Sequence, residues 1–293
     1  MWNGKKVLEI AQSDYISYFL NSIIVRKEED RIIIPINQID TILITNPRCN
    51  ISVPLINEIV NNNINVIICD SKYRPTVQIS PINGYYSNKI FLTQIKWNIQ
   101  FKEINWREII KLKILNYIKL VYFLDILNDE DIEKLLNYYE SVLLYDKSNC
   151  EDAAKLTFKI LYGNEFSRDD ENQINTFLNY GYTVLMTYVS RSIIKNGLDN
   201  RIGIFHKSFN NHFALSCDVM EPLRCLIDKL VYEFIFVYEK RDFILFKKDL
   251  FCIFEEKVKV NDKLLTVNEY IDKLVKSIIN NNLNHKEFIV EWS

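Results

Sequence analysis

The chain has 293 residues, 48% of them hydrophobic and 25% charged, enough for one large domain or two ordinary ones. Its formal net charge of -2 excludes a polycation, so any contact with nucleic acid needs a local basic patch. No run of about 18 apolar residues occurs, so we expect no membrane span and no membrane partner. Glu9 and Asp14 interrupt any export signal, and the six scattered cysteines form no C-x-x-C pair, which favours a cytoplasmic protein with reduced thiols.

The first third of the chain predicts a β-rich domain. Short, isoleucine-rich segments with partial alternation of apolar and polar residues are typical of strands. They cover residues 6–10, 15–25, 30–36, 39–45 and 64–70. Between the last two, residues 53–63 place apolar side chains at helical spacing, so one helix is expected within this domain.

The pattern then changes to apolar residues every three to four positions, which indicates helices. These patterns cover residues 106–127, 152–161, 172–196, 219–240 and 264–281. Gly181 inside one of them is typical of close helix packing. We place the boundary near residues 88–97 and predict an α+β protein: a β-rich domain over 1–93, then an all-α domain over 94–293.

The stretch "FHKSFNNHFALSCDVMEPLRCLIDKL", residues 205–230, supports two interpretations. Asp218 followed three residues later by Glu221 resembles a capping box, and Pro222 is tolerated in a first helical turn. Alternatively, carboxylates three residues apart share a helix face and can hold a hard cation such as Mg²⁺ or Mn²⁺. His206 could then add an imidazole ligand. The spacing alone does not separate the two.

A second acidic site occurs in "DKSNCEDAAKLTFKILYG". Ser148 followed by Glu151 also matches a capping box. The helix start that this box predicts would equally attract a phosphate group, because its backbone N–H groups are unpaired. Structural and catalytic interpretations therefore stay open here too.

Together, the pieces "DKSNCEDAA", "LYGNEFSRD", "INTFLNYGYTVL" and "FHKSFNNHFALSCDVMEPLRCLIDKLVYE" resemble, in family order, the CRISPR-associated spacer-acquisition integrase, the first of the Cas proteins, and most closely its type II branch. The resemblance covers nearly the whole chain. It implies an N-terminal β-sandwich-like domain and a C-terminal helical catalytic domain. It also implies that Glu151, His206 and Glu221 form a metal-binding catalytic triad, with Asp218 as a supporting acid. Asp152 departs from the family, which often has glycine there.

The function implied by this resemblance is metal-dependent cleavage and integration of DNA with Mg²⁺ or Mn²⁺. The 3′-hydroxyl of a short foreign DNA fragment would attack a phosphodiester in the CRISPR repeat array, and water in its place would give nuclease activity. Arg201, Lys207 and Arg224 are candidate phosphate contacts by their position in the sequence. The implied partners are double-stranded DNA, a second copy of the chain bound through the β domain, the smaller second Cas protein, and further type II adaptation proteins.

Two other functions compete with this hypothesis. One is a catalytically silent, helical DNA-binding or scaffold protein that has kept only the fold. The other is a Cys–His hydrolase built on Cys217 or Cys225. Both cysteines lie on the apolar flank of a helix pattern, where an inert thiol is expected.

Overall fold

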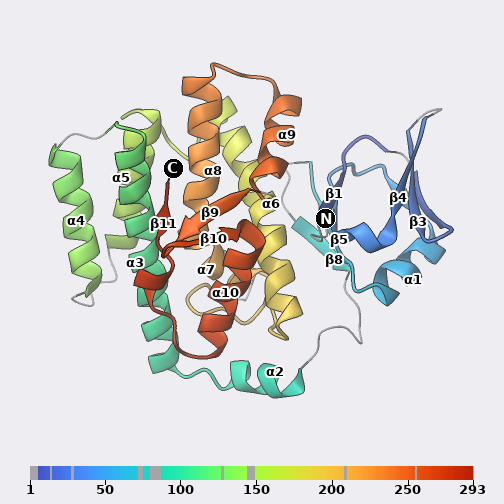
Figure 1. Ribbon diagram of the computed structural model, residues 1–293, viewed down its shortest axis with the longest axis horizontal. Helices are drawn as coiled ribbons and strands as arrows, with labels where there is room; N and C mark the ends of the chain where they lie inside the picture. The colour runs from blue at the N-terminus through green and yellow to red at the C-terminus, as the bar shows by residue number, and fades with distance from the viewer. Residues whose placement is uncertain are drawn as a thin grey trace. The chain divides into compact units, whose positions relative to one another are not determined.

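Figure 1 shows the computed structural model of the chain, which divides into two compact units, Met1–Tyr86 and Ser87–Ser293. The structure describes residues 6–13, 15–27, 30–71, 75–79, 87–126, 129–143, 149–207, 210–254 and 256–292. The units divide seven residues before the end of the expected β domain at residue 93. Helix α2 (Asn88–Ile95) therefore belongs to the second unit.

In its described residues, the first unit has two four-stranded sheets and one α-helix. One sheet has the order β1 (Lys6–Ile10), β5 (Ile39–Ile44), β7 (Asn65–Cys69), β8 (Pro75–Ile79); its first three strands are parallel and β8 is antiparallel. The other has the order β4 (Asp30–Pro35), β3 (Ser22–Lys27), β2 (Tyr15–Phe19), β6 (Asn50–Ile51). Helix α1 (Val53–Asn61) completes the unit.

Isoleucines from both sheets fill one shared core in this unit. Ile16 and Ile23 of the second sheet and Ile42 of the first are fully buried, together with Leu55 of α1. The expected strand 15–25 is in fact a hairpin, because Leu20 and Asn21 adopt positive φ angles of 44° and 56°, as two-residue hairpin turns require.

The second unit is largely helical. Besides α2, its helices are α3 (Ile99–Phe123), α4 (Asp129–Leu143), α5 (Asn149–Tyr162), α6 (Gln173–Lys195), α7 (Ala214–Met220), α8 (Arg224–Tyr232), α9 (Phe243–Ile253) and α10 (Val267–Ile279). In Figure 1, α4 and α5 lie at one side of this unit, and α6 and α8 run through its middle. A β carbon on Gly181 of α6 would lie 2.4 Å from the Ile227 side chain of α8, so close helix packing is confirmed.

A small sheet in this unit was not expected. It has the order β10 (Lys263–Thr266), β9 (Lys257–Val260), β11 (Val290–Glu291). The helix predicted from residue 264 therefore begins only at Val267, where Thr266 and Glu269 form a true capping box. The α+β class, with β-sheets first and a largely helical region after them, is confirmed. Among the described helices, none combines the length and apolar character needed to cross a membrane.

Candidate active site around His206 and Glu221

Asp218 is the residue that organises the predicted site. It lies in α7, is fully buried, and its carboxylate accepts hydrogen bonds from three successive backbone N–H groups. These donors are Ile204 at 2.6 Å, Phe205 at 3.1 Å and His206 at 3.1 Å. The carboxylate therefore holds the 204–206 loop against α7. Each hydrogen bond that it accepts reduces the free-energy cost of burying its negative charge.

The loop approaches this carboxylate closely because residue 203 is glycine. A β carbon on Gly203 would lie 2.8 Å from Asp218 Oδ2 and 2.6 Å from the carbonyl oxygen of His206. Neither distance is tolerable for a real side chain. Substitution here would move the loop, and His206 with it.

The His206 ring is oriented by the same carboxylate. Its Nδ1 lies 2.7 Å from Asp218 Oδ1, so Nδ1 carries the proton and Nε2 is the nitrogen left for a ligand or a proton. The hydrogen bond and charge of Asp218 raise the pKa of His206, against the effect of burial, and the charge of Glu221 acts in the same direction. With 38% of its side chain exposed, His206 is reachable by substrate.

Glu221 is buried between two cations. Lys113 of α3 donates to its Oε2 at 2.6 Å, while Nε of Arg224 donates to Oε1 at 3.0 Å and Nη2 forms an ion pair with the same oxygen at 3.0 Å. Burial raises the pKa of Glu221, but Arg224 and Lys113 outweigh it and lower the pKa to about 2. The site therefore keeps a charged carboxylate at any physiological pH.

A second buried acid lies behind this cluster. Asp228 of α8 accepts hydrogen bonds from the Tyr117 hydroxyl at 2.5 Å and from the Tyr182 hydroxyl. Burial raises its pKa to about 6, although both hydroxyls and Arg224 act against the rise. Because the Arg224 guanidinium stacks 4.6 Å over the Tyr182 ring, the same tyrosine contacts both Asp228 and the cation that holds Glu221.

The capping-box interpretation of Asp218 and Glu221 is wrong. Asp218 lies inside α7 rather than before it, and its oxygens bind the 204–206 loop. Glu221 starts a 3₁₀ turn that continues α7 into α8, where its carboxylate faces Lys113 and Arg224. Both carboxylates are thus used in tertiary contacts around His206.

The second predicted box lies partly outside the described residues. Ser148 is outside them, and Glu151 stands in the first turn of α5, while its side chain is not among those described. Asp152 next to it is exposed and lies 3.9 Å from Lys155. The described side chains contain no group of three His, Cys, Asp or Glu that could bind a metal, and the Glu151 side chain is not among them.

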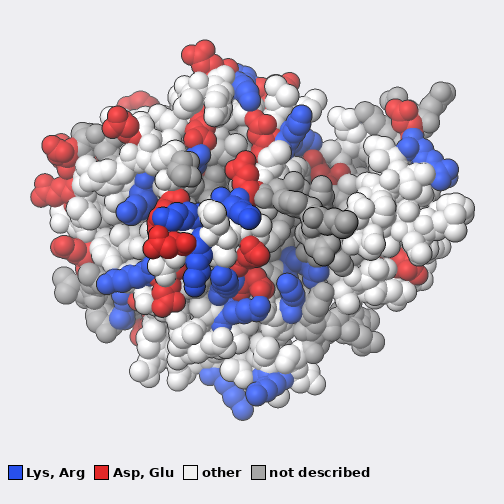
Figure 2. Space-filling view, in the orientation of Figure 1, with Lys and Arg blue, Asp and Glu red and all other residues white. Residues whose placement is uncertain are grey.

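The three predicted phosphate contacts differ in their surroundings. Arg201 is exposed and forms an ion pair with Asp199 at 2.6 Å. Lys207 is also exposed, one residue after His206. Arg224 is turned inward onto Glu221, so its charge acts on that carboxylate. The face in Figure 2 mixes basic and acidic side chains, in keeping with the small net charge.

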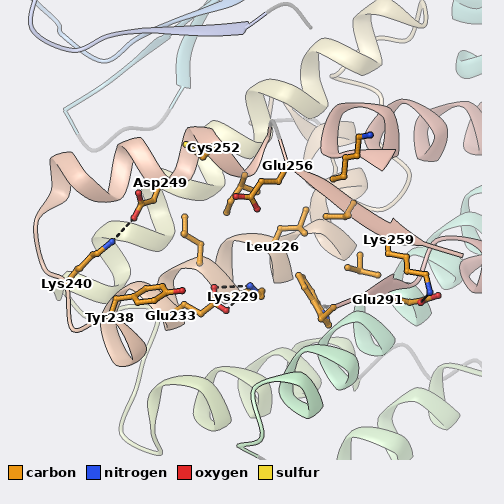
Figure 3. Close-up of a pocket in the computed structure, with 16 residues that line it drawn as sticks. Leu226, Lys229, Glu233, Tyr238, Lys240, Asp249, Cys252, Glu256, Lys259 and Glu291 are labelled. Atoms are coloured by element: carbon orange, nitrogen blue, oxygen red, sulfur yellow. Dashed lines mark hydrogen bonds and ion pairs between the residues drawn. The ribbon is translucent and has the colours of Figure 1, made fainter. Parts of the chain in front are cut away.

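A cavity of about 450 Å³ lies elsewhere in the second unit, between α8, α9 and the small sheet (Figure 3). None of the predicted site residues lines it. Two of its lysines are paired with acids: Lys229 binds Glu233 at 2.8 Å and Lys240 lies 3.3 Å from Asp249. These pairs offset part of the charge that a phosphate would need, so the His206–Glu221 cluster stays the better candidate.

The thiols do not support a Cys–His hydrolase. Burial raises the pKa of both Cys217 and Cys225, which disfavours the reactive thiolate. The Cys225 thiol donates to the carbonyl oxygen of Pro222 at 3.3 Å, and the Cys217 sulfur accepts from Asn211 Nδ2 at 3.5 Å. In these contacts each sulfur faces a group other than an imidazole.

Sequence reasoning missed several members of the site. Lys113 left one signal, a lysine inside the apolar run of α3. Asp228 left another, since it follows Glu221 by two helical turns and lies on the same face. Tyr117 and Tyr182 gave no signal in the sequence, because a tyrosine among apolar residues is typical of the hydrophobic core.

Comparison with known proteins finds one family. The model of the family "CRISPR associated protein Cas1" matches residues 10–157 and 165–259. The CRISPR-associated endonuclease Cas1 of Neisseria meningitidis serogroup C (strain 8013) is 31% identical over 209 residues, which are 71% of this chain and 67% of that protein.

Solved structures share the fold. A casposase bound to an integration product is similar with a TM-score of 0.76 at 17% identity, covering 97% of this chain and 93% of that one. A chain of a Cas6-RT-Cas1–Cas2 complex gives a TM-score of 0.77 at 17% identity; the match covers all of this chain and 36% of the other.

Proposed function

Because the chain belongs to the family of CRISPR-associated protein Cas1, we propose that it is a divalent-metal-dependent DNA endonuclease and integrase. It inserts short foreign DNA fragments into a CRISPR repeat array, and its motifs around Glu151 and His206 resemble those of the type II branch. The observation that carries the proposal is a histidine whose Nδ1 is fixed by Asp218 beside a buried, permanently charged Glu221.

The donor set fits Mg²⁺ or Mn²⁺. Glu221 offers carboxylate oxygen, and its Oε2 accepts one hydrogen bond in the described structure, which leaves a lone pair. His206 offers Nε2, and Glu151 would complete the set. Once bound, the ion would polarise the scissile phosphate and stabilise charge on the attacking and leaving oxygens.

The chain's own residues supply the rest of the chemistry. Asp218 holds the imidazole so that Nε2 either binds the metal or accepts the proton of the attacking 3′-hydroxyl. Lys113 and Arg224 keep Glu221 ionised and add positive charge where the phosphodiester gains negative charge. Lys207 and Arg201, both exposed, serve as outer phosphate contacts.

The proposed partners follow from the family. Double-stranded DNA is the substrate, a second copy of the chain binds through the β domain, and the smaller second Cas protein and further type II adaptation proteins complete the assembly. The fold similarity to a casposase with an integration product and to a chain of a Cas1–Cas2 complex supports this.

Glu151→Gln and Glu221→Gln test the proposal, with Asp152→Asn as the matched neighbour. A neutral amide is a poor ligand for a hard divalent ion, so the two glutamine variants should lose nearly all integration and nuclease activity in Mg²⁺ or Mn²⁺. Asp152→Asn should keep the activity. Glu221→Gln removes the anion between two buried cations and should destabilise the fold. Its activity should therefore be measured at a temperature well below the thermal midpoint of this variant.

Near-wild-type integration by both glutamine variants would refute the metal triad. Retained DNA binding without any cleavage or integration by the wild-type chain, supplied with its smaller partner, would instead favour the silent scaffold.

A further inference from the structure

Helix α3 carries two buried lysines, Lys111 and Lys113, each 9% exposed. Lys111 binds Glu108 at 2.8 Å and Lys113 binds Glu221 at 2.6 Å. They are alike in residue type, burial and kind of partner. They differ in that only the acceptor of Lys113 belongs to the proposed active site.

Glu221 already has a cationic partner without Lys113. Arg224 donates to Oε1 through Nε and forms an ion pair with it through Nη2, and a carboxylate carries a single negative charge. Lys113 is therefore a second buried cation on one carboxylate. Arg224 contacts Glu221 through Oε1 and also acts on the buried acid Asp228, so Lys113 is the cation that covers the remaining oxygen, Oε2. Oε2 is also the oxygen that a divalent ion would need.

We propose that the ammonium of Lys113 competes with the divalent cation for Oε2 of Glu221. In the metal-free protein it compensates the charge of this carboxylate, and it gives way when the ion binds. The side chain is suited to this, because an ammonium on a flexible four-carbon stem moves easily, whereas the planar guanidinium of Arg224 contacts Oε1 through two nitrogens and is more fixed. This inference rests on the proposed function.

Metal binding by the DNA-free protein tests the competition. Mn²⁺ affinity is measured by electron paramagnetic resonance and Mg²⁺ affinity by calorimetry for the wild type, Lys113→Met, Lys113→Arg and Lys111→Met. Removing a unit charge next to a buried ligand should tighten binding about tenfold or more in Lys113→Met. Lys113→Arg keeps the charge in a less mobile side chain and should bind no more tightly than the wild type. Lys111→Met, whose lost ion pair lies at Glu108, should stay close to the wild type.

Lys113→Gln provides a second neutral variant that retains a hydrogen-bond donor to Glu221. Mn²⁺ should also raise the thermal midpoint of either neutral variant more than that of the wild type. A merely structural lysine would predict the opposite: weaker or unchanged binding once it is removed. Neutral variants that bind Mn²⁺ no more tightly than the wild type, or gain no larger thermal shift, overturn the inference.

The two levels of failure are distinguishable. If the wild type binds neither ion, or Glu221→Gln binds as well as the wild type, the metal site of the proposed function is itself wrong. If the wild type binds through Glu221 and the neutral variants show no tightening, only the competition by Lys113 fails.

Discussion

Two histidine–carboxylate pairs occur in the second unit, and they are built alike. His206 places Nδ1 2.7 Å from Asp218 and its backbone N–H on the same carboxylate at 3.1 Å. His285 places Nδ1 2.6 Å from Glu108 and its backbone N–H on that carboxylate at 3.0 Å. In both pairs, one carboxylate binds the imidazole ring and the backbone N–H of the same histidine.

The pairs differ at the other ring nitrogen. Nε2 of His285 lies 2.9 Å from the Tyr139 hydroxyl, and the residue is 5% exposed. Within the described part of the chain, Nε2 of His206 has no hydrogen-bond partner, and over a third of its side chain is exposed. A histidine held by an acid is therefore not in itself a functional signal; a free and reachable second nitrogen is.

The sharpest way to break this comparison is to remove each ring. His206→Ala should reduce integration and nuclease activity by about 10²- to 10⁴-fold, the range for a positioned acid–base group. His285→Ala should leave the activity unchanged and lower the thermal midpoint, because Glu108 and Tyr139 lose a buried partner. Metal-dependent integration and thermal melting of both variants decide the matter.

His212→Ala is a further control, since His212 lies in the same loop region and contributes no predicted ligand. An active His206→Ala, or an inactive but folded His285→Ala, would mean that the two pairs have been assigned the wrong roles.

A smaller effect is expected on the pH dependence of activity when Asp218 is replaced. Asp218 raises the pKa of His206, so the neutral ring needed for metal binding or proton transfer appears only above the usual histidine value of about 6.5. Asp218→Asn removes this charge, and the acid limb of the activity profile should move to lower pH. Glu108→Gln should leave the limb in place. An unmoved limb in Asp218→Asn would show that His206 does not control it.

Much of the fold was predictable because its signals are local. The isoleucine-rich strands alternate or form short apolar runs, and α3 and α6 repeat every three to four residues. The small sheet was missed because β11 has two residues and β10 leads directly into α10. β11 is defined by its long-range pairing with β9 rather than by its own composition. β10 pairs with β9 in a local hairpin, whose two-residue turn at Asn261 and Asp262 was hidden by the helix predicted from residue 264.

The site was predictable only in part, for a related reason. The resemblance placed Glu151, His206, Asp218 and Glu221, but local spacing also fitted capping boxes, and nothing local told Asp218 apart from a helix cap. Its role depends on the loop 204–206 folding back onto α7. Lys113 is 108 residues away from Glu221 along the chain, a distance over which spacing carries no information.

A third test concerns stability at acid pH. Burial raises the pKa of Glu108, but hydrogen bonds from His285 and Lys111 outweigh it and lower the pKa to about 2. A lowered pKa stabilises the fold above the ordinary value of about 4.5, and this contribution disappears as the pH falls toward 2. The thermal midpoint of Glu108→Gln should therefore vary less with pH than that of the wild type between pH 5 and pH 2.5. Thermal melting curves of both proteins across that pH range would show this difference. If the thermal midpoints of the two proteins fell in parallel with pH, the stabilising contacts of Glu108 with His285 and Lys111 would be contradicted.

The smallest expected effect comes from Tyr139→Phe, which removes only the hydroxyl that covers Nε2 of His285. One hydrogen bond contributes about 1 kcal/mol, so the free energy of unfolding should fall by about that amount, with no change in integration. The ring keeps its packing, and Glu108 still fixes Nδ1, so the variant gives His285 the free second nitrogen that distinguishes His206. It still lacks exposure and a neighbouring Glu221. A gain of metal binding at His285 in this variant would show that a free nitrogen alone is enough; unchanged metal binding would show that the site also requires the open surface and the charged carboxylate beside it.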